Sequence, residues 1–131
     1  MSRHGPEQRR AADQRGRSAE ERAAELLEAS GYTLLARRYR VRGGEVDLIA
    51  ADPDGVLAFV EVKARAVGAD ALAAVGARQR ARIVTGALTY IAETPERAAS
   101  PLRFDVIAVD GTGALYHLAD AWRPEGDHGA F

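Results

Sequence analysis

Residues 44–65 read GEVDLIAADPDGVLAFVEVKAR, two apolar segments joined by Asp52-Pro53-Asp54-Gly55. Proline fits the first central position of a type I turn, and glycine readily takes the left-handed conformation that follows it. We therefore predict an antiparallel hairpin with strands at residues 45–51 and 56–65. This hairpin decides the fold because its register fixes which charged side chains share a face.

The register follows from the length of the loop. If the loop is the three residues Pro53-Asp54-Gly55, Asp47 falls opposite Glu61 and Glu45 opposite Lys63. All four side chains then project from one face, because side chains alternate along a strand. Opposed residues have Cβ atoms ~4.5–5.5 Å apart, so one hard cation can bridge Asp47 and Glu61. A loop one residue shorter or longer would separate these groups, and the proline–glycine turn favours the first register.

Lys63 is the single lysine in a chain with 18 Lys and Arg residues. Arginine stays charged at any working pH, whereas lysine is a compact donor whose pKa can be tuned. Phosphodiester cleavage adds negative charge at phosphorus and requires a deprotonated water. Mg²⁺ or Mn²⁺ on Asp47 and Glu61 answers both needs, and Lys63 can orient the water or neutralise the charge. Glu20 would add an outer carboxylate if its helix packs near the hairpin.

The same pattern has a simpler interpretation. Alternating charges are common on half-exposed strands, so Glu45 and Lys63 can form an ordinary ion pair while Asp47 and Glu61 face solvent. Against this, Phe59 is expected on the face of Glu61. The other face is expected to carry four apolar side chains: Val46, Leu48, Val60 and Val62. A sheet covered on both sides follows, and acidic groups on a covered face need partners, of which a metal is one.

The remaining periodicity predicts two helices and three more strands. The first helix runs from about Ala19 to Ser30, with Ser18 and Glu21 as a capping box and Gly31 as C-cap. The other elements are a strand at 32–41, a helix at 70–93 with a break before Ala77, and strands at 102–109 and 114–118. The order α-β-β-β-α-β-β favours an α/β fold: a mixed central sheet flanked by helices, one on each face, since a long crossover helix usually links parallel neighbours.

The composition describes an ordinary globular chain of 131 residues with no cysteine. We expect a basic, disordered arm at 1–15, one folded domain at 16–119 and a flexible tail at 120–131. Without thiolates, a metal must be held by oxygen or histidine nitrogen, and the three histidines lack ligand spacing. Asp105 is expected to pair with an arginine. No apolar run approaches ~20 residues and no secretory signal is present, which predicts a cytoplasmic protein with no membrane span.

The charge is unevenly distributed, although the net charge of −1 does not identify a nucleic-acid binder. Four arginines crowd the segment before the carboxylate strand: Arg37, Arg38, Arg40 and Arg42. Such clusters supply phosphate contacts within a neutral domain, and a solvated arginine face is the alternative. On the second helix, Gln79 and Arg80 are placed to hold water or phosphate. The expected partner is nucleic acid, with DNA preferred.

The motifs GEVDLIA (44–50), FVEVKAR (59–65) and RFDV (103–106) together resemble those of the YraN-like family of small bacterial proteins. The resemblance covers residues 16–119 and implies a restriction-endonuclease-like fold with a PD-(D/E)xK nuclease core. It places Glu20, Asp47, Glu61 and Lys63 at the active-site positions, and Gln79 where related nucleases carry a helical glutamine. Three positions depart from the family pattern, but none is a presumed metal ligand: Ala19, Arg38 and Arg78.

The expected function is that of a nuclease dependent on Mg²⁺ or Mn²⁺ that cleaves DNA, with branched or repair intermediates among the candidate substrates. Two alternatives stay open. One is a non-catalytic nucleic-acid-binding module of the same fold, and the other is a structural or protein-interaction domain. A homodimer is considered because many structure-selective nucleases dimerise, although the sequence shows no obvious dimer interface.

Overall fold

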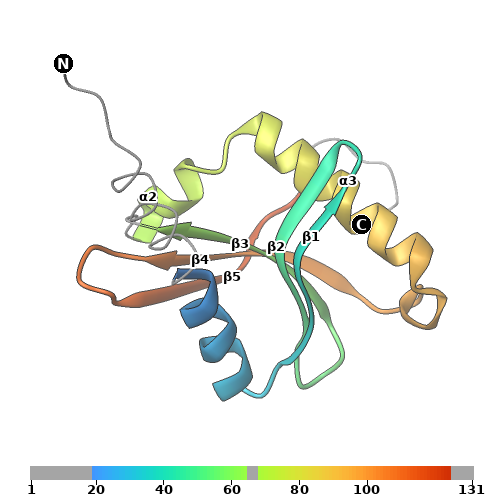
Figure 1. Cartoon of the computed structure of the whole chain (residues 1–131), viewed down its shortest axis with the longest axis horizontal. Coiled ribbons are helices and arrows are strands. Elements are labelled where there is room, and N and C mark those ends of the chain that lie inside the picture. The colour runs from blue at the N-terminus through green and yellow to red at the C-terminus, as the bar shows by residue number, and fades with distance from the viewer. Residues whose placement is uncertain (1–18, 65–67, 125–131) are drawn as a thin grey trace, which may run out of the picture.

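The structure, a computed structural model, describes residues 19–64 and 68–124. Its middle layer is a five-stranded sheet in the order β1-β2-β3-β4-β5. A helix at residues 19–29 covers one face, and α2 (Gly68–Ala73) and α3 (Ala77–Glu93) cover the other (Figure 1). The strands are β1 (Thr33–Val41), β2 (Gly44–Ala51), β3 (Leu57–Ala64), β4 (Leu102–Val109) and β5 (Leu115–Trp122), and a 3-10 turn, η1 (Pro95–Arg97), precedes β4.

The sheet is mixed, as the order of elements predicted. Strands β1, β2 and β3 form an antiparallel meander, β3 and β4 are parallel, and β4 and β5 are antiparallel. The segment α2–α3–η1 makes the crossover that a parallel pair requires. The α/β class with helices on both faces is therefore confirmed. The expected arm at 1–15, the cap at Ser18 and the tail beyond residue 124 lie outside the described residues.

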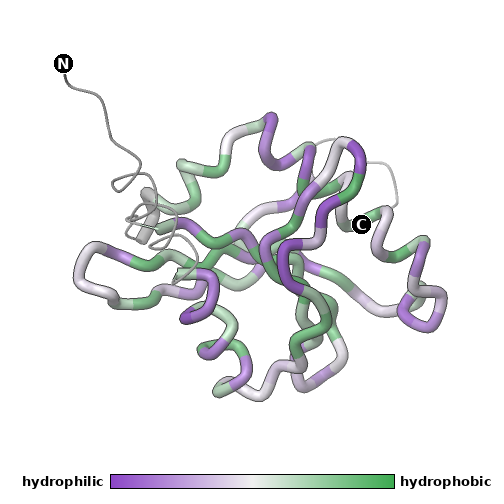
Figure 2. Tube along the Cα trace, viewed as in Figure 1, coloured by the Kyte–Doolittle hydropathy of each residue, from purple (hydrophilic) through white to green (hydrophobic). Residues whose placement is uncertain are grey.

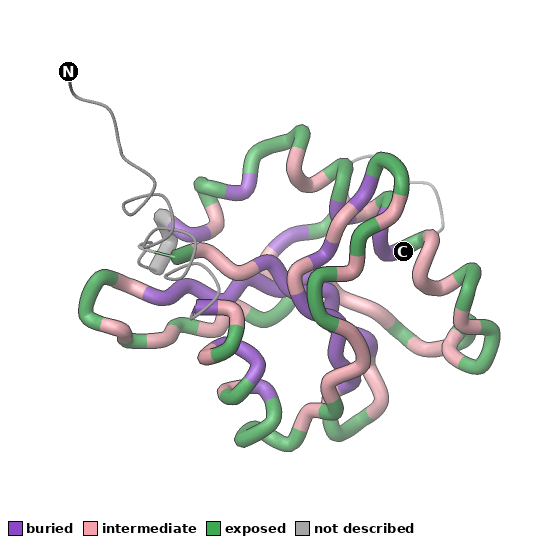
Figure 3. Tube along the Cα trace, in the orientation of Figure 1, coloured by how far each residue is buried: buried purple, intermediate pink, exposed green. Residues whose placement is uncertain are grey.

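Two apolar clusters fill the two faces of the sheet. The cluster under α2 and α3 includes Phe59, Ile83 and Phe104. The cluster under the N-terminal helix includes Leu27 and Val60. Figure 2 shows apolar stretches along the central strands, and Figure 3 shows that the same stretches are buried. The central strands are thus covered on both sides, as the hairpin sequence predicted. No helix in the described part of the chain is long and apolar enough to cross a membrane.

The central hairpin has the predicted register. Asp52 N–H donates to the Val56 carbonyl and Gly55 N–H donates to the Asp52 carbonyl, each at 2.9 Å. Gly55 has a φ of 88°, the left-handed conformation expected at the end of this turn. The pairing then runs up to Leu48 opposite Val60.

Beyond Leu48 and Val60 the hairpin opens into a fork. There, β2 continues along β1 and β3 continues along β4, and Figure 1 shows the two strand pairs diverging. At the fork an Asp47 Oδ2 accepts a hydrogen bond from Val62 N–H at 2.8 Å. A side chain of β2 thus bonds the backbone of β3 where the ladder ends.

The predicted alternation of faces is wrong at Val46. Val46 packs in the cluster under α3, whereas Leu48 packs in the cluster under the N-terminal helix. The irregularity lies opposite Asp47 on the neighbouring strand: Arg38, between the pairs Arg37↔Leu48 and Tyr39↔Val46, has a φ of 49°. A left-handed residue inside a strand rotates the backbone, so the face alternation does not carry through this point.

Local signals explain the helices. The N-terminal helix ends at Ala29, one residue before the predicted Ser30. Gly31 follows as the predicted C-cap, with Tyr32 N–H bonded to the Leu27 carbonyl and Gly31 N–H bonded to the Glu28 carbonyl. The long second helix is interrupted, as anticipated, and α3 starts at Ala77. It packs directly on the β1–β2 turn, because a Cβ at Gly44 would lie 2.6 Å from the Gly86 nitrogen.

The last strand extends further than predicted. It reaches Trp122, so residues 120–122, which were assigned to the tail, belong to the sheet. A register shift between Phe104 and Val106 interrupts its pairing with β4, and Asp120 has a φ of 52°. Side chains do not alternate regularly through this bulge, so the alternation of apolar and polar residues alone does not predict that the strand continues.

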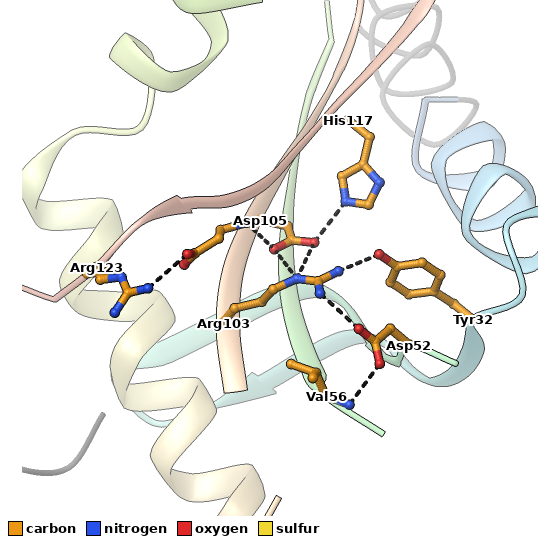
Figure 4. Close-up of polar contacts among 8 residues, drawn as sticks. Tyr32, Asp52, Val56, Arg103, Asp105, His117 and Arg123 are labelled. Atoms are coloured by element: carbon orange, nitrogen blue, oxygen red, sulfur yellow. Dashed lines mark hydrogen bonds and ion pairs between the residues drawn. The ribbon is translucent and has the colours of Figure 1, made fainter. Parts of the chain in front are cut away.

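A buried polar network ties β4 to three other segments (Figure 4). Asp105 is fully buried and accepts hydrogen bonds from Arg103 Nε at 3.0 Å and from Asp120 N–H at 2.9 Å, and its Oδ2 lies 2.8 Å from His117 Nε2. Arg103 also donates to Asp52 at 2.9 Å and to the Tyr32 hydroxyl. The predicted pairing of Asp105 with an arginine is therefore present.

Candidate active site

Two carboxyl groups meet at the fork, one from β2 and one from β3. Asp47 and Glu61 are hydrogen-bonded to each other, and Asp47 also accepts the Val62 N–H. Only 6 % of the Glu61 side chain is exposed. The structure thus brings together the two residues that the hairpin register placed opposite each other.

Both carboxyl groups are harder to ionise here than they would be in water. Burial, reinforced by the charge and hydrogen bond of Asp47, raises the pKa of Glu61 to about 8, against the opposing effect of Lys63. Burial also raises the pKa of Asp47, although the Val62 hydrogen bond opposes this shift and Glu20 adds to it. Neighbouring carboxyls disfavour each other's ionisation, and the positive charge of Lys63 offsets only part of this effect.

Lys63 and Gln79 complete the site from β3 and α3. Lys63 Nζ donates to Gln79 Oε1 at 2.8 Å and lies 3.4 Å from Glu61 Oε2. Gln79 Nε2 in turn donates to the same Glu61 oxygen. Gln79 therefore links the lysine to the acidic pair, and α3 positions it there through its packing on the β1–β2 turn.

Glu45 does not face Lys63, which corrects one prediction. Its carboxylate lies 3.7 Å from Arg40 Nε and 3.9 Å from Arg82 Nε. The ladder that would have placed Glu45 opposite Lys63 ends at the fork. The simple cross-strand ion pair is thus absent, and the lysine is directed toward Glu61 instead.

Glu20 approaches the site from the N-terminal helix. Its Oε1 accepts a hydrogen bond from Arg38 Nε at 2.6 Å, and its charge is close enough to raise the pKa of Asp47. An open pocket of about 150 Å³ lies beside this ion pair, lined by Glu20, Glu21, Arg37, Arg38 and Leu48. The pairing of Glu20 with Arg38 has no signal in the sequence, because it depends on how the helix docks on the sheet.

The arginines expected to contact phosphate divide into two groups. Four are exposed on β1 and the turn after it: Arg37, Arg38, Arg40 and Arg42. Arg80 behaves differently, since its Nε donates to the Val75 carbonyl at 2.9 Å and its guanidinium lies 5.2 Å from the centre of the Trp122 ring. These contacts favour a structural role for Arg80.

The donor set at the fork fits a hard divalent cation. Asp47 is half-buried and Glu61 is buried, so a second negative charge at this place is costly, and a bound divalent cation would compensate it. No group of three or more His, Asp or Glu side chains within residues 19–64 and 68–124 is arranged to hold a metal. Asp47 and Glu61 would therefore hold the ion together with water.

Removing the ionisable group at Glu61 is expected to stabilise the metal-free protein in alkali. Its pKa is about 8 in the folded chain against an ordinary 4.5, so the free energy of unfolding falls as pH rises between these values. Glu61→Gln mimics the protonated acid and removes this loss. Urea unfolding in EDTA should show the variant more stable than wild type by about 1–3 kcal/mol at pH 9, with little difference at pH 4.

Glu28→Gln is the matched control, because Glu28 is exposed on the N-terminal helix. It should follow the wild-type pH dependence. If the free energy of unfolding of Glu61→Gln fell between pH 5 and pH 8 as steeply as that of wild type, Glu61 would not be the carboxyl group with the raised pKa.

Residues 19–109 match the sequence pattern of a family described as "Uncharacterised protein family UPF0102". A UPF0102 protein of Rhodopseudomonas palustris is 48 % identical over 112 residues, which cover 86 % of this chain and 85 % of the relative. A UPF0102 protein of Granulibacter bethesdensis is 44 % identical over 82 % of this chain and 68 % of its own length.

Comparison with solved structures finds more distant similarities. A repair endonuclease from Pyrococcus abyssi is 20 % identical with a TM-score of 0.38, over 66 % of this chain and 33 % of its own. SfsA of Pyrococcus furiosus, solved in complex with Ca²⁺, is 15 % identical with a TM-score of 0.31, over 82 % of this chain and 63 % of its own. This chain thus spans a third of the first structure and less than two thirds of the second.

Proposed function

The chain belongs to the uncharacterised protein family UPF0102, the YraN-like family that its motifs resemble, and from its site we propose that it is a nuclease dependent on Mg²⁺ or Mn²⁺ that cleaves DNA. The observation that carries this proposal is the contact between the half-buried Asp47 and the buried Glu61, with Lys63 beside them. An acidic pair that would hold a divalent cation, with an ammonium group beside it, can supply the charge neutralisation and the water activation that assist phosphodiester hydrolysis.

Each residue has a distinct part in this proposal. Asp47 and Glu61 would hold the cation, which supplies charge neutralisation at the phosphoryl group and a more acidic water. Lys63 would donate to the attacking water or to a phosphoryl oxygen. Gln79 keeps the lysine in place through its bond to Nζ. The exposed arginines of β1 would hold backbone phosphates on either side of the scissile bond.

The test compares wild type with Asp47→Ala on branched, single-stranded and duplex DNA in Mn²⁺. Loss of one of the two carboxylates should abolish cleavage and weaken Mn²⁺ binding at least tenfold in a calorimetric titration. Asp54→Ala, at an exposed turn position, is the control that should behave like wild type. Cleavage that survives Asp47→Ala at the wild-type rate would refute the assignment.

One observation favours a second function, that of a non-catalytic nucleic-acid-binding module. Lys63, Gln79 and Glu61 satisfy one another, so the site is internally paired without a metal. A module of this kind should bind DNA in EDTA and in Mn²⁺ alike, show no cleavage and be unaffected by Asp47→Ala. The same titrations therefore separate it from the nuclease, and absence of both DNA and metal binding would leave an interaction domain.

A further inference from the structure

The ion pair between Arg38 and Glu20 lies at the entrance to the fork. Arg38 is on β1 opposite Asp47 in the β1–β2 register, and its Nε donates to Glu20 Oε1 at 2.6 Å. Both side chains line the open pocket beside the site. A basic side chain exposed to solvent and a carboxylate near the acidic pair are thus held together.

The backbone at Arg38 is unusual for its residue type. Its φ of 49° lies in the left-handed region, which arginine adopts at a cost that glycine or asparagine would largely avoid. Such conformations persist where the surroundings determine them, and they gather at functional sites. Here the conformation presents the guanidinium to Glu20 at the edge of the pocket.

The ion pair is suited to exchange because both partners are accessible. The side chains of Arg38 and Glu20 are 40 % and 23 % exposed. Exposed ion pairs contribute little stability, so a competing anion can displace the carboxylate. A guanidinium recognises phosphate by the same paired hydrogen bonds that it makes to carboxylate.

We propose that Arg38 is a positioning residue that exchanges Glu20 for a backbone phosphate when nucleic acid binds. In the free protein Arg38 holds the Glu20 carboxylate. Once the guanidinium moves to the phosphate, Glu20 is released beside Asp47, where it adds a third carboxylate to the acidic pair. The role of the released Glu20 in binding a cation rests on the proposed nuclease function. The move of Arg38 from Glu20 to a phosphate does not require catalysis.

A coupling between the two ligands follows from this exchange. Nucleic acid frees the carboxylate that helps a divalent cation, and the cation draws Glu20 away from Arg38, which then favours phosphate. By linkage the two effects must be equal in size. The metal site is therefore expected to be weak in the free protein and stronger on nucleic acid.

The first test needs no metal. In EDTA, Glu20→Gln removes the carboxylate that competes with phosphate for Arg38 and should tighten binding of a labelled DNA duplex about three- to tenfold in fluorescence anisotropy. Glu21→Gln is the matched control, because Glu21 lines the same pocket and loses the same charge. Arg38→Gln should weaken binding, and Glu20→Gln should give no gain in the Arg38→Gln background. Equal gains from Glu20→Gln and Glu21→Gln would overturn the exchange.

The second test measures Mn²⁺ affinity with and without a phosphorothioate oligonucleotide that resists cleavage. The oligonucleotide should raise the Mn²⁺ affinity of wild type several-fold, and in Arg38→Gln this coupling should vanish while the affinity of the free protein rises. Thermal unfolding checks that each variant is folded. Full coupling in Arg38→Gln would overturn the inference. A wild type that binds no Mn²⁺ would instead refute the nuclease, and the EDTA titration alone would then decide the exchange at Arg38.

Discussion

Lys63→Ala is expected to lower the rate of the proposed DNA cleavage about 10²–10³-fold, the usual effect of losing one donor aimed at developing negative charge. Lys63 Nζ is held by Gln79 and lies 3.4 Å from Glu61, so it is fixed beside the acidic pair. The affinity for Mn²⁺ should change little, because the carboxylate oxygens remain. A fall in kcat without a matching loss of metal or DNA affinity would identify Lys63 as acting on the transition state.

Lys63→Arg sharpens this expectation. Apart from Lys63, all Lys and Arg residues of the chain are arginine. The lysine at this position therefore suggests that a guanidinium cannot take its place in the site. The Lys63 side chain is 23 % exposed and is bonded to Gln79, which leaves little room for a planar fork. Lys63→Arg should therefore lose at least tenfold in rate. Arg123→Ala, at a remote position whose side chain is 81 % exposed, is the control for a general loss of positive charge.

The central hairpin was predictable because its information is local. The turn residues fix the loop length, the loop length fixes the register, and the register brings Asp47 to Glu61. The fork was not predictable in this way. It arises where β2 stays with β1 and β3 stays with β4, which depends on pairings between segments that are far apart in the sequence.

The contacts of the charged side chains also divide into those that local sequence predicts and those that depend on distant segments. The Arg103–Asp105 contact joins neighbours two residues apart on one face of a strand, so it could be expected. The Arg38–Glu20 and Gln79–Lys63 contacts each bring a helix against the sheet, and no local pattern encodes the docking. His117 on β5 and Asp105 on β4 also meet only through the pairing of two strands.

Asp105→Ala is expected to cost about 3–5 kcal/mol of stability, enough to unfold a marginal domain. The substitution removes the acceptor for Arg103, His117 and the Asp120 N–H at once. It leaves the Arg103 guanidinium, whose side chain is 18 % exposed, with half of its charge compensation. The bulge in β5 also loses the bond that fixes Asp120 in its left-handed conformation. Chemical unfolding of the metal-free protein measures the loss.

The pH dependence distinguishes loss of charge from loss of packing. Burial alone would raise the pKa of Asp105, but hydrogen bonds from His117, Arg103 and Asp120 outweigh it and hold the pKa below the ordinary 3.8. A carboxyl with a lowered pKa stabilises the fold above its ordinary value, and this stability is lost as pH falls below that value. The free energy of unfolding of wild type should therefore exceed that of Asp105→Asn by a constant amount above about pH 5. This difference should become smaller below about pH 4. Asp54→Asn, at an exposed turn, should show no such margin. A constant difference in the free energy of unfolding between wild type and Asp105→Asn at every pH would mean that the shape of Asp105, and not its buried negative charge, stabilises the fold.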